Sequence, residues 1–182
     1  GVAVNSSSSG IFLCLKYFDL PEQEITIPAY TYLSVPQAIA HAGHGIVFDK
    51  TLDWQGIYQL KPLPVYDAAK RLTSNMYTAG TMMCLSFHIK KHLKIGKGGM
   101  ILTDNEEAVK WLRKARYEGR SEKKYKEDDI TMLGWNMYMT PQQASHGLAL
   151  MQNYPEHVPD LIEEGGYRDL TEFTIFKECK TV

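Results

Sequence analysis

Four short groups of residues in this sequence carry side chains suited to chemistry on a small ligand. The first, Ser7-Ser8-Ser9-Gly10, comes directly before an apolar stretch with helical spacing, residues 11–18. Free amides, hydroxyls and the positive end of the helix dipole make such a helix start a site for a phosphate group. Simple capping of the helix by the serines is the competing interpretation.

The second and third groups follow predicted strands. Tyr30-Thr31-Tyr32 comes after a strand predicted at 25–27, and an aromatic ring there could stack on a flat ligand ring. Asp67 follows a strand predicted at 63–66, and its carboxylate could keep a ring nitrogen protonated. The aromatic residues could equally belong to the core or its rim, and the aspartate could equally cap a helix.

The fourth group is Ser86-Phe87-His88-Ile89-Lys90-Lys91, at the end of an apolar strand predicted at 82–87. A lysine buried beside a ligand loses its proton more readily and becomes a nucleophile toward an aldehyde. Solvated surface charges are the alternative for both lysines. The following Gly96-Lys97-Gly98-Gly99 precedes a strand rather than a helix, so it lacks the context of a phosphate-binding P-loop.

The elements that position these groups alternate between strands and helices. Further strands are predicted at 2–4, 46–48 and 100–103, and helices at 11–18, 34–42 and 105–117, with a last helix opened by Thr140-Pro141. This alternation predicts an α/β fold, a three-layer α/β/α domain with a mostly parallel sheet. Ligands in such sheets bind beyond the carboxyl ends of the strands, where the four groups fall.

Composition narrows the class of protein. The 182 residues fit one domain, with 44% hydrophobic and 23% charged residues and a net charge of -1. We therefore expect no nucleic-acid partner, and no apolar run is long enough to span a membrane. Three scattered cysteines and no signal peptide favour a reduced, cytoplasmic protein without a disulfide framework. Neither the cysteines nor the histidines are grouped as metal ligands, so no metal site is expected.

The order of these motifs resembles the DegT/DnrJ/StrS aminotransferases. The matching segments are the serine-rich helix start, Pro-Ala-Tyr-Thr-Tyr, Asp-Ala-Ala, Cys-Leu-Ser-Phe-His-Ile-Lys-Lys and Gly-Lys-Gly-Gly-Met, between about Val4 and Leu150. The resemblance implies the large domain of the fold-type-I enzymes that use pyridoxal 5′-phosphate (PLP), in shortened form. It also implies transfer of an amino group from an amino acid to a nucleotide-linked keto-sugar.

The resemblance assigns roles to particular residues. The pattern Ser-Phe-x-x-x-Lys selects Lys91 as the Schiff-base lysine, and Asp67 is the partner of the pyridine nitrogen. Tyr32 is expected to stack on the ring, and Ser8, Ser9 and Ser86 to hold the phosphate. Asn136, in Gly134-Trp135-Asn136-Met137-Tyr138, is expected to reach the phosphate of a neighbouring subunit, which implies a homodimer with shared active sites.

The sequence also departs from the family pattern. Lys70 replaces the usual glutamine or histidine after Asp-Ala-Ala, and Tyr138 replaces an arginine. Asp49 and Asp67 are close enough in sequence that a strand and its helix are expected to be missing. The predicted organisation is a shortened PLP-binding domain at 1–152 and a tail at 153–182 that is the remnant of the small domain.

Other functions stay open at this stage. The chain could be a non-catalytic remnant that keeps the fold and the cofactor or dimer contacts. It could be a phosphate- or nucleotide-binding module built on the serines and the glycine run. Sugar dehydration, known in some relatives, is disfavoured because those proteins carry histidine where this chain has Lys91.

Overall fold

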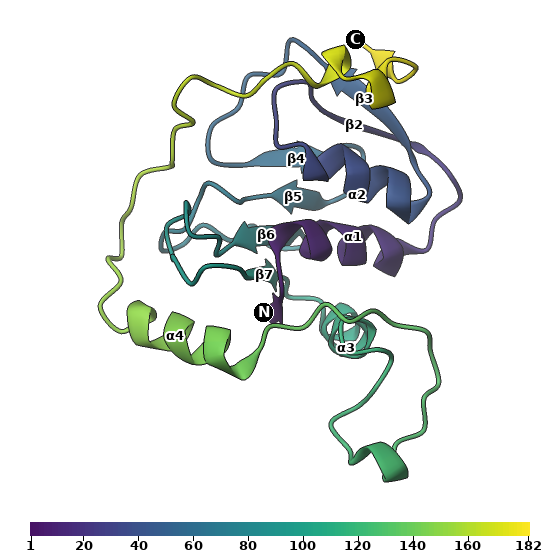
Figure 1. The fold of residues 1–182 in the computed structure, drawn as a ribbon, viewed down its shortest axis with the longest axis vertical. Helices are drawn as coiled ribbons and strands as arrows, with labels where there is room; N and C mark the ends of the chain where they lie inside the picture. Colours follow the sequence, from purple (N-terminus) through teal and green to yellow (C-terminus); the bar gives the residue numbers. More distant parts are fainter.

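The computed structural model describes all 182 residues. A five-stranded sheet has the order β1-β7-β6-β5-β4, and a three-stranded sheet has the order β2-β3-β8 (Figure 1). The elements are β1 (Val2–Val4), α1 (Ser7–Phe18), β2 (Glu24–Pro28), α2 (Ser34–Ala42), β3 (Gly45–Asp49), β4 (Tyr58–Leu60), β5 (Val65–Asp67), β6 (Met82–Ser86), β7 (Gly99–Leu102), α3 (Glu106–Ala115), α4 (Pro141–Met151) and β8 (Lys180–Thr181). Short 3-10 turns occupy Tyr125–Glu127, Leu170–Glu172 and Thr174–Phe176.

The expected α/β class is confirmed. The sheets are mixed, because parallel and antiparallel strand pairs occur in equal number. The pairs β2–β3, β3–β8 and β5–β6 are parallel, whereas β1–β7, β4–β5 and β6–β7 are antiparallel. The connection from β4 to β5 is too short for the crossover that a parallel pair needs. An isolated bridge between Thr26 and Lys61 joins the two sheets, and no helix lies between β3 and β5.

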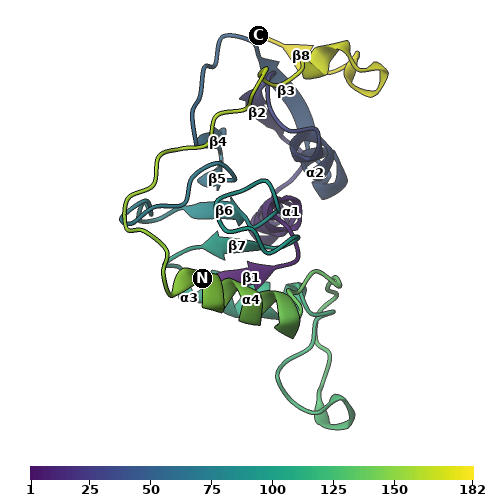
Figure 2. The same cartoon turned by 60° about the vertical axis from the view of Figure 1, so that its left-hand side comes forward.

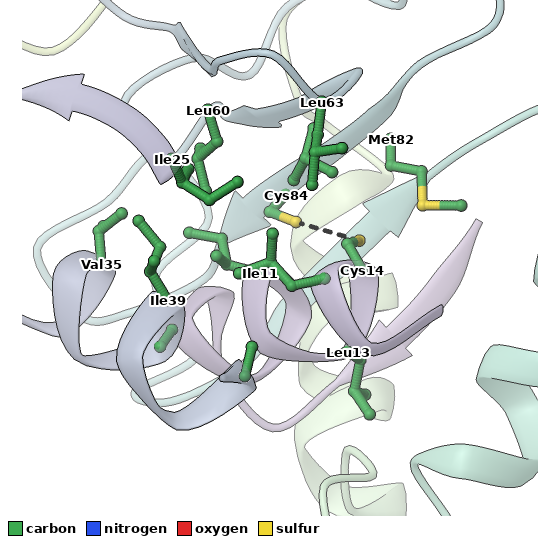
Figure 3. Close-up of a cluster of buried hydrophobic side chains, with 14 of the residues drawn as sticks. Ile11, Leu13, Cys14, Ile25, Val35, Ile39, Leu60, Leu63, Met82 and Cys84 are labelled. Atoms are coloured by element: carbon green, nitrogen blue, oxygen red, sulfur yellow. Dashed lines mark hydrogen bonds between the residues drawn. The ribbon is translucent and has the colours of Figure 1, made fainter. Parts of the chain in front are cut away.

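Helix α1 packs against β5, β6 and β7 and against α2, on one face of the strands (Figure 2). Its apolar positions Ile11, Leu13 and Leu15 are fully buried in a cluster of 26 core residues. Figure 3 shows this cluster, in which the Cys14 and Cys84 sulfurs lie 3.7 Å apart as free thiols. Their separation in the chain gives no sign of this proximity, and no disulfide joins them.

The opposite face of the large sheet carries a smaller core. Along β6 the side chains alternate, so that Met82 and Cys84 face α1 while Met83 and Leu85 join the second cluster with Leu93 and others. A Cβ added at Gly147 would lie 3.6 Å from Ile95, so α4 covers part of this face. Residues of the loop 68–80 pack over the rest. The third layer is therefore thinner than the helical layer on the α1 face.

Most predicted elements are found within one or two residues of their expected bounds, but α1 begins at Ser7 rather than at residue 11, because Ser6 is its N-cap. Gly43 ends α2 with φ +93°, and Thr140 forms a capping box with Gln143 at the start of α4. The strand expected at 63–66 is shifted to Val65–Asp67, and α3 ends at Ala115 rather than near Tyr117. Strands β4 and β8 were not predicted. No helix is both long and apolar enough to cross a bilayer.

The segment after α4 runs along one side of the molecule to β8, which pairs with β3 (Figure 1). On its way, the Ser74 amide donates to the Glu156 carbonyl, and the Leu161 amide donates to the Lys70 carbonyl. The segment therefore crosses the loop that follows β5, at the edge of the sheet where the predicted site residues lie.

Candidate functional site

The start of α1 lies directly against the ends of β6 and β7. Gly99 pairs with Ser86, and a Cβ added at Gly99 would come within 2.7 Å of the backbone of both Ser6 and Ser7. The Ser7 hydroxyl donates to the Cys84 carbonyl on β6. This close approach brings the serine-rich helix start and Ser86 to one edge of the sheet.

The serines at the start of α1 have different hydrogen-bond partners. Ser6 is the N-cap, and its Oγ accepts from the Ser9 amide at 3.1 Å. The Ser9 hydroxyl donates to Asn5 Oδ1 at 2.7 Å, whereas the Ser8 and Ser34 hydroxyls are paired at 2.5 Å. The amides of the first helical residues have no acceptor inside the helix. The helix start therefore presents free amides together with the Ser8 hydroxyl.

Asp67 is a buried carboxylate at the end of β5. Oδ2 accepts from the Tyr58 hydroxyl at 3.0 Å, and Oδ1 accepts from the Ala69 amide at 2.9 Å. The Tyr58 oxygen also lies 2.7 Å from the Thr31 hydroxyl. Burial raises the pKa of Asp67, although these hydrogen bonds and the charges of Lys91 and Lys70 oppose the shift.

Lys91 is half-buried on the loop between β6 and β7, and none of the ion pairs in the structure involves it. Burial lowers its pKa, and the nearby Asp67 carboxylate acts in the opposite direction. Each of these two groups therefore senses the charge of the other across the same edge of the sheet. A lysine of this kind holds an unprotonated amine at a lower pH than a solvated one does.

Lys70 is a second buried cation beside Asp67. Its Nζ lies 3.1 Å from Glu163 Oε2, 4.6 Å from the centroid of the Tyr167 ring and 5.6 Å from that of Trp54. Trp54 and Tyr167 stack on each other with an interplanar angle of 18°. All four residues line a cavity of about 600 Å³, which the tail closes on one side.

The remaining predicted residues have different surroundings. Tyr32 is 61% exposed, near enough to Tyr167 to contribute to its raised pKa, for which burial is the main cause. Ser86 is half-buried, and its Oγ accepts weakly from the His88 amide at 3.4 Å. Asn136 is exposed and donates to Glu118 at 2.6 Å, so within one chain it does not join Asp67 and Lys91.

Several residues of the site have no local signal in the sequence. Tyr58 lies on the unpredicted strand β4, and Glu163 and Tyr167 come from the aperiodic tail. Thr31 stands between the two tyrosines that were singled out, but it is Thr31, not its neighbours, that connects to Tyr58 and Asp67.

Comparison with known proteins identifies what this arrangement resembles. Residues 63–160 match the DegT/DnrJ/EryC1/StrS aminotransferase family. An uncharacterized protein of Methanocaldococcus jannaschii is 30% identical over 143 residues, which cover 71% of this chain and 36% of that protein.

Two solved structures have the same fold. One is a Bacillus cereus protein described as a PLP-dependent aminotransferase, with a TM-score of 0.76 at 15% sequence identity. The matched region covers 99% of this chain and 76% of the Bacillus cereus chain. The sugar aminotransferase CalS13 of Micromonospora echinospora has a TM-score of 0.67 at 17% identity, over 84% of this chain and 56% of its own. The chain thus spans about a third of its curated relative and about half of the sugar aminotransferase.

Proposed function

The chain belongs to the DegT/DnrJ/EryC1/StrS aminotransferase family, and from this premise we propose that it binds PLP and transfers an amino group from an amino acid to a nucleotide-linked keto-sugar. One observation supports the proposal more than any other. Asp67 ends β5 beside Cys84 of β6, half-buried Lys91 lies on the loop that leaves the same end of β6, and the Ser7 hydroxyl at the start of α1 donates to the Cys84 carbonyl. An amine, a carboxylate and a phosphate site are the three groups that PLP requires of a protein.

The residues present fit this cofactor. The Lys91 amine is free of ion pairs and its pKa is lowered, as expected of an amine that reacts with an aldehyde. Asp67 is held by the Tyr58 hydroxyl and the Ala69 amide, which fix the carboxylate while leaving it room to accept a further proton donor. The Ser8 hydroxyl, the free amides of α1 and the Ser86 hydroxyl supply donors for a phosphate.

When bound, PLP supplies an aldehyde and a pyridinium ring that accepts electron density from the Cα of an amino acid. Asp67 would hold the proton on the ring nitrogen, because a buried carboxylate favours a cationic neighbour. The Lys91 amine would move a proton at the Cα of the amino donor, and its lowered pKa favours the unprotonated form that this step needs. Tyr32, which is exposed at this edge, would cover one face of the ring.

The proposal extends to a homodimer with shared sites. Asn136 is exposed and has only the Glu118 carboxylate as a side-chain partner in this chain, so its amide is available to the site of a second copy. In such a dimer the phosphate contacts of Ser8, Ser9 and Ser86 are completed by Asn136 of the neighbouring subunit. Residues 1–152 would then form the shortened PLP-binding domain, and residues 153–182 would be the remnant of the small domain.

A second function is favoured by the course of the tail. Glu163 and Tyr167 surround Lys70 at the site edge, where a substrate needs access. The alternative is therefore a non-catalytic relative that keeps the fold and binds PLP without turnover.

Borohydride reduction of the protein incubated with PLP tests the cofactor proposal. We expect one PLP group fixed on Lys91, detected by peptide mass mapping. The variant Lys91→Arg loses the label, and the matched variant Lys90→Arg, on the exposed neighbour, keeps it. A colourless protein without a labelled lysine would reject PLP binding.

A separate assay decides between the enzyme and its non-catalytic alternative. The PLP-loaded protein is given glutamate and a panel of nucleotide-linked keto-sugars, and amino-sugar formation is measured. Turnover that disappears in Lys91→Arg supports the aminotransferase. PLP bound on Lys91 without turnover on any acceptor supports the non-catalytic alternative.

A further inference from the structure

A short segment of the tail, residues 162–167, crosses the candidate site between two ionic anchors, and we call it the strap. It belongs to the long run between α4 and β8 (Figure 1). Before the strap, Asp160 pairs with Arg71 at 2.6 Å, and after it, Asp169 pairs with Lys50 at 2.9 Å. Arg71 follows β5 and Lys50 follows β3. The strap is therefore held at both ends, above the ends of two strands.

The strap itself has few contacts. It contains no helix or strand, and its Ile162 side chain is 80% exposed. Gly165 and Gly166 both have positive φ, and a Cβ added at either would meet nothing within 4 Å. Glycines give the backbone wide freedom, and a segment with few buried contacts opens at a low cost in free energy. The strap can therefore move while its anchors stay in place.

Two side chains hold the strap down. Glu163 Oε2 lies 3.1 Å from Lys70 Nζ, and the Glu163 side chain is 42% exposed whereas that of Lys70 is 6% exposed. The Tyr167 ring stacks on Trp54 with centroids 5.8 Å apart, and Lys70 Nζ lies 4.6 Å from its centroid. One ion pair and one aromatic stack with a cation beside it thus keep the strap closed.

The same two side chains lie against the residues that PLP would need. Both line the cavity of about 600 Å³. Burial lowers the pKa of Lys91, while the charges of Asp67 and Glu163 raise it. Burial raises the pKa of Tyr167, and the charges of Glu163 and Asp67 raise it further. Because such influence falls with distance, a carboxylate and a flat ring of the strap lie close to the Lys91 amine and the Asp67 carboxylate.

Lys70 does not depend on Glu163 alone for a negative neighbour. Burial raises the pKa of Asp67, and the charge of Lys70 lowers it, so these two groups also attract each other. When Glu163 leaves, the buried ammonium therefore keeps the Asp67 carboxylate nearby. The cost of exposing an unpaired buried charge, which would lock the strap shut, is reduced in this way.

We propose that the strap is an autoinhibitory cover, which must move away before PLP reaches Lys91 and Asp67. Glu163 and Tyr167 occupy part of the space that the cofactor needs, so closure of the strap and capture of PLP exclude each other. The inference rests on the proposed function, because it concerns the regulation of the same site. Any change that weakens closure should speed capture of the cofactor.

The rate of PLP capture tests the proposal. The full chain is mixed with PLP, portions are reduced with borohydride at successive times, and the label on Lys91 is measured by peptide mass. Loss of the charge-assisted contact in Glu163→Gln should speed labelling by about tenfold. Glu164→Gln is the matched control, because Glu164 is exposed and has no ion pair, and it should keep the parent rate.

A second pair of variants separates coverage from charge. Glu163→Gln also removes a charge that raises the pKa of Lys91, which by itself makes the amine more reactive. Tyr167→Ala removes the stacked ring and leaves every carboxylate and ammonium in place, so faster labelling in this variant comes from an open strap. Tyr125→Ala removes a tyrosine that is 72% exposed on another loop, and it should keep the parent rate.

A measurement without PLP reports on the strap itself. In protein made with 5-fluorotryptophan, the fluorine NMR signal of Trp54 should move in Tyr167→Ala, and Glu163→Gln should move it the same way, but Glu164→Gln should not. The proposal is overturned if this signal stays at its parent position in Glu163→Gln, or if Tyr167→Ala captures PLP at the parent rate. If the signal moves as expected but no variant captures PLP, the proposed function fails and the strap guards no cofactor site.

Discussion

The Arg71 guanidinium donates two hydrogen bonds to the Asp160 carboxylate, from Nε to Oδ1 at 2.8 Å and from Nη2 to Oδ2 at 2.6 Å. Arg71 follows β5 and Asp160 belongs to the tail, so this pair fastens the tail across the edge of the sheet. The Asp160 carboxylate also occupies the space beside Gly56, where an added Cβ would lie 2.2 Å from it. Gly56 thus permits the pair that docks the tail.

Gly56→Ala should undock the tail. The new methyl group would overlap the Asp160 carboxylate, which costs about 1–3 kcal/mol beyond any backbone strain. Gly80→Ala is the matched control, because Gly80 has φ +77° against +73° at Gly56 but no neighbour within 4 Å. It should cost only the strain, about 1 kcal/mol. Faster hydrogen exchange at residues 156–163 in Gly56→Ala alone confirms the role of Asp160, and equal effects of both variants contradict it.

Docking of the tail should weaken in acid. The Arg71 hydrogen bond lowers the pKa of Asp160 below its ordinary 3.8, despite partial burial. A lowered carboxyl pKa stabilises the docked state above pH 3.8, and this contribution is lost as the pH falls through the lowered value. NMR exchange of the Leu161 amide, which donates to the Lys70 carbonyl, measures the change. Asp160→Asn cannot titrate, so its tail should be looser at neutral pH and less sensitive to acid.

The reactivity of Lys91 should depend on Asp67. Competitive labelling of the Lys91 amine with acetic anhydride should reach half its maximal rate below the ordinary lysine pKa of 10.5, because burial lowers the pKa of this amine. Asp67→Asn removes a negative charge that raises the pKa of Lys91, so the midpoint should fall further. If the midpoint stays the same in Asp67→Asn, the two side chains do not share a site.

Asp67→Asn should lower the affinity for PLP without lowering the stability of the fold at pH 7. Burial raises the pKa of Asp67, so its contribution to stability is complete below pH 3.8 and is lost as the pH rises through the raised value. At pH 7 the neutral asparagine should therefore be at least as stable as aspartate, with Tyr58 able to turn its hydroxyl toward Thr31. PLP affinity should fall at the same time. A variant that melts earlier than the parent at pH 7 would show that the ionised carboxylate stabilises the fold.

Local signals in the sequence were sufficient for the helices and for the order of the site motifs. Serines before an apolar stretch marked the start of α1, although the cap is Ser6 and the phosphate candidates Ser8 and Ser9 lie in the first turn of the helix. Thr140-Pro141 marked α4 because a capping oxygen and a proline at the first position act within one turn. Asp67 and Lys91 were selected by motif, and their mutual electrostatic influence agrees with a common edge.

Contacts between distant parts of the chain could not be predicted in the same way. Arg71 and Asp160 are 89 residues apart, and nothing near either residue points to the other. β8 is a two-residue strand that forms by pairing with the open edge of β3, with Lys180 also paired to Glu24 of β2. The thinner layer opposite α1 and the enclosure of Lys70 by the tail follow from such contacts. They depend on tertiary packing rather than on periodicity.

The last prediction concerns Gly99, whose backbone lies in close contact with the start of α1. In Gly99→Ala the Cβ would lie 2.7 Å from backbone atoms of Leu85, Ser6 and Ser7, none of which can rotate away. The helix start must then move off β6, at a cost of about 3 kcal/mol. Gly45→Ala is the control, since Gly45 is also in a strand but its nearest contact is a flexible side-chain atom at 3.6 Å. It should be within about 0.5 kcal/mol of the parent, because alanine suits a strand at least as well as glycine. Chemical unfolding measures the free energy of unfolding of both variants.

The PLP affinity of Gly99→Ala, measured under conditions in which this variant is still folded, should fall because the helix amides and Ser86 no longer face one phosphate. Unchanged affinity would place the phosphate elsewhere.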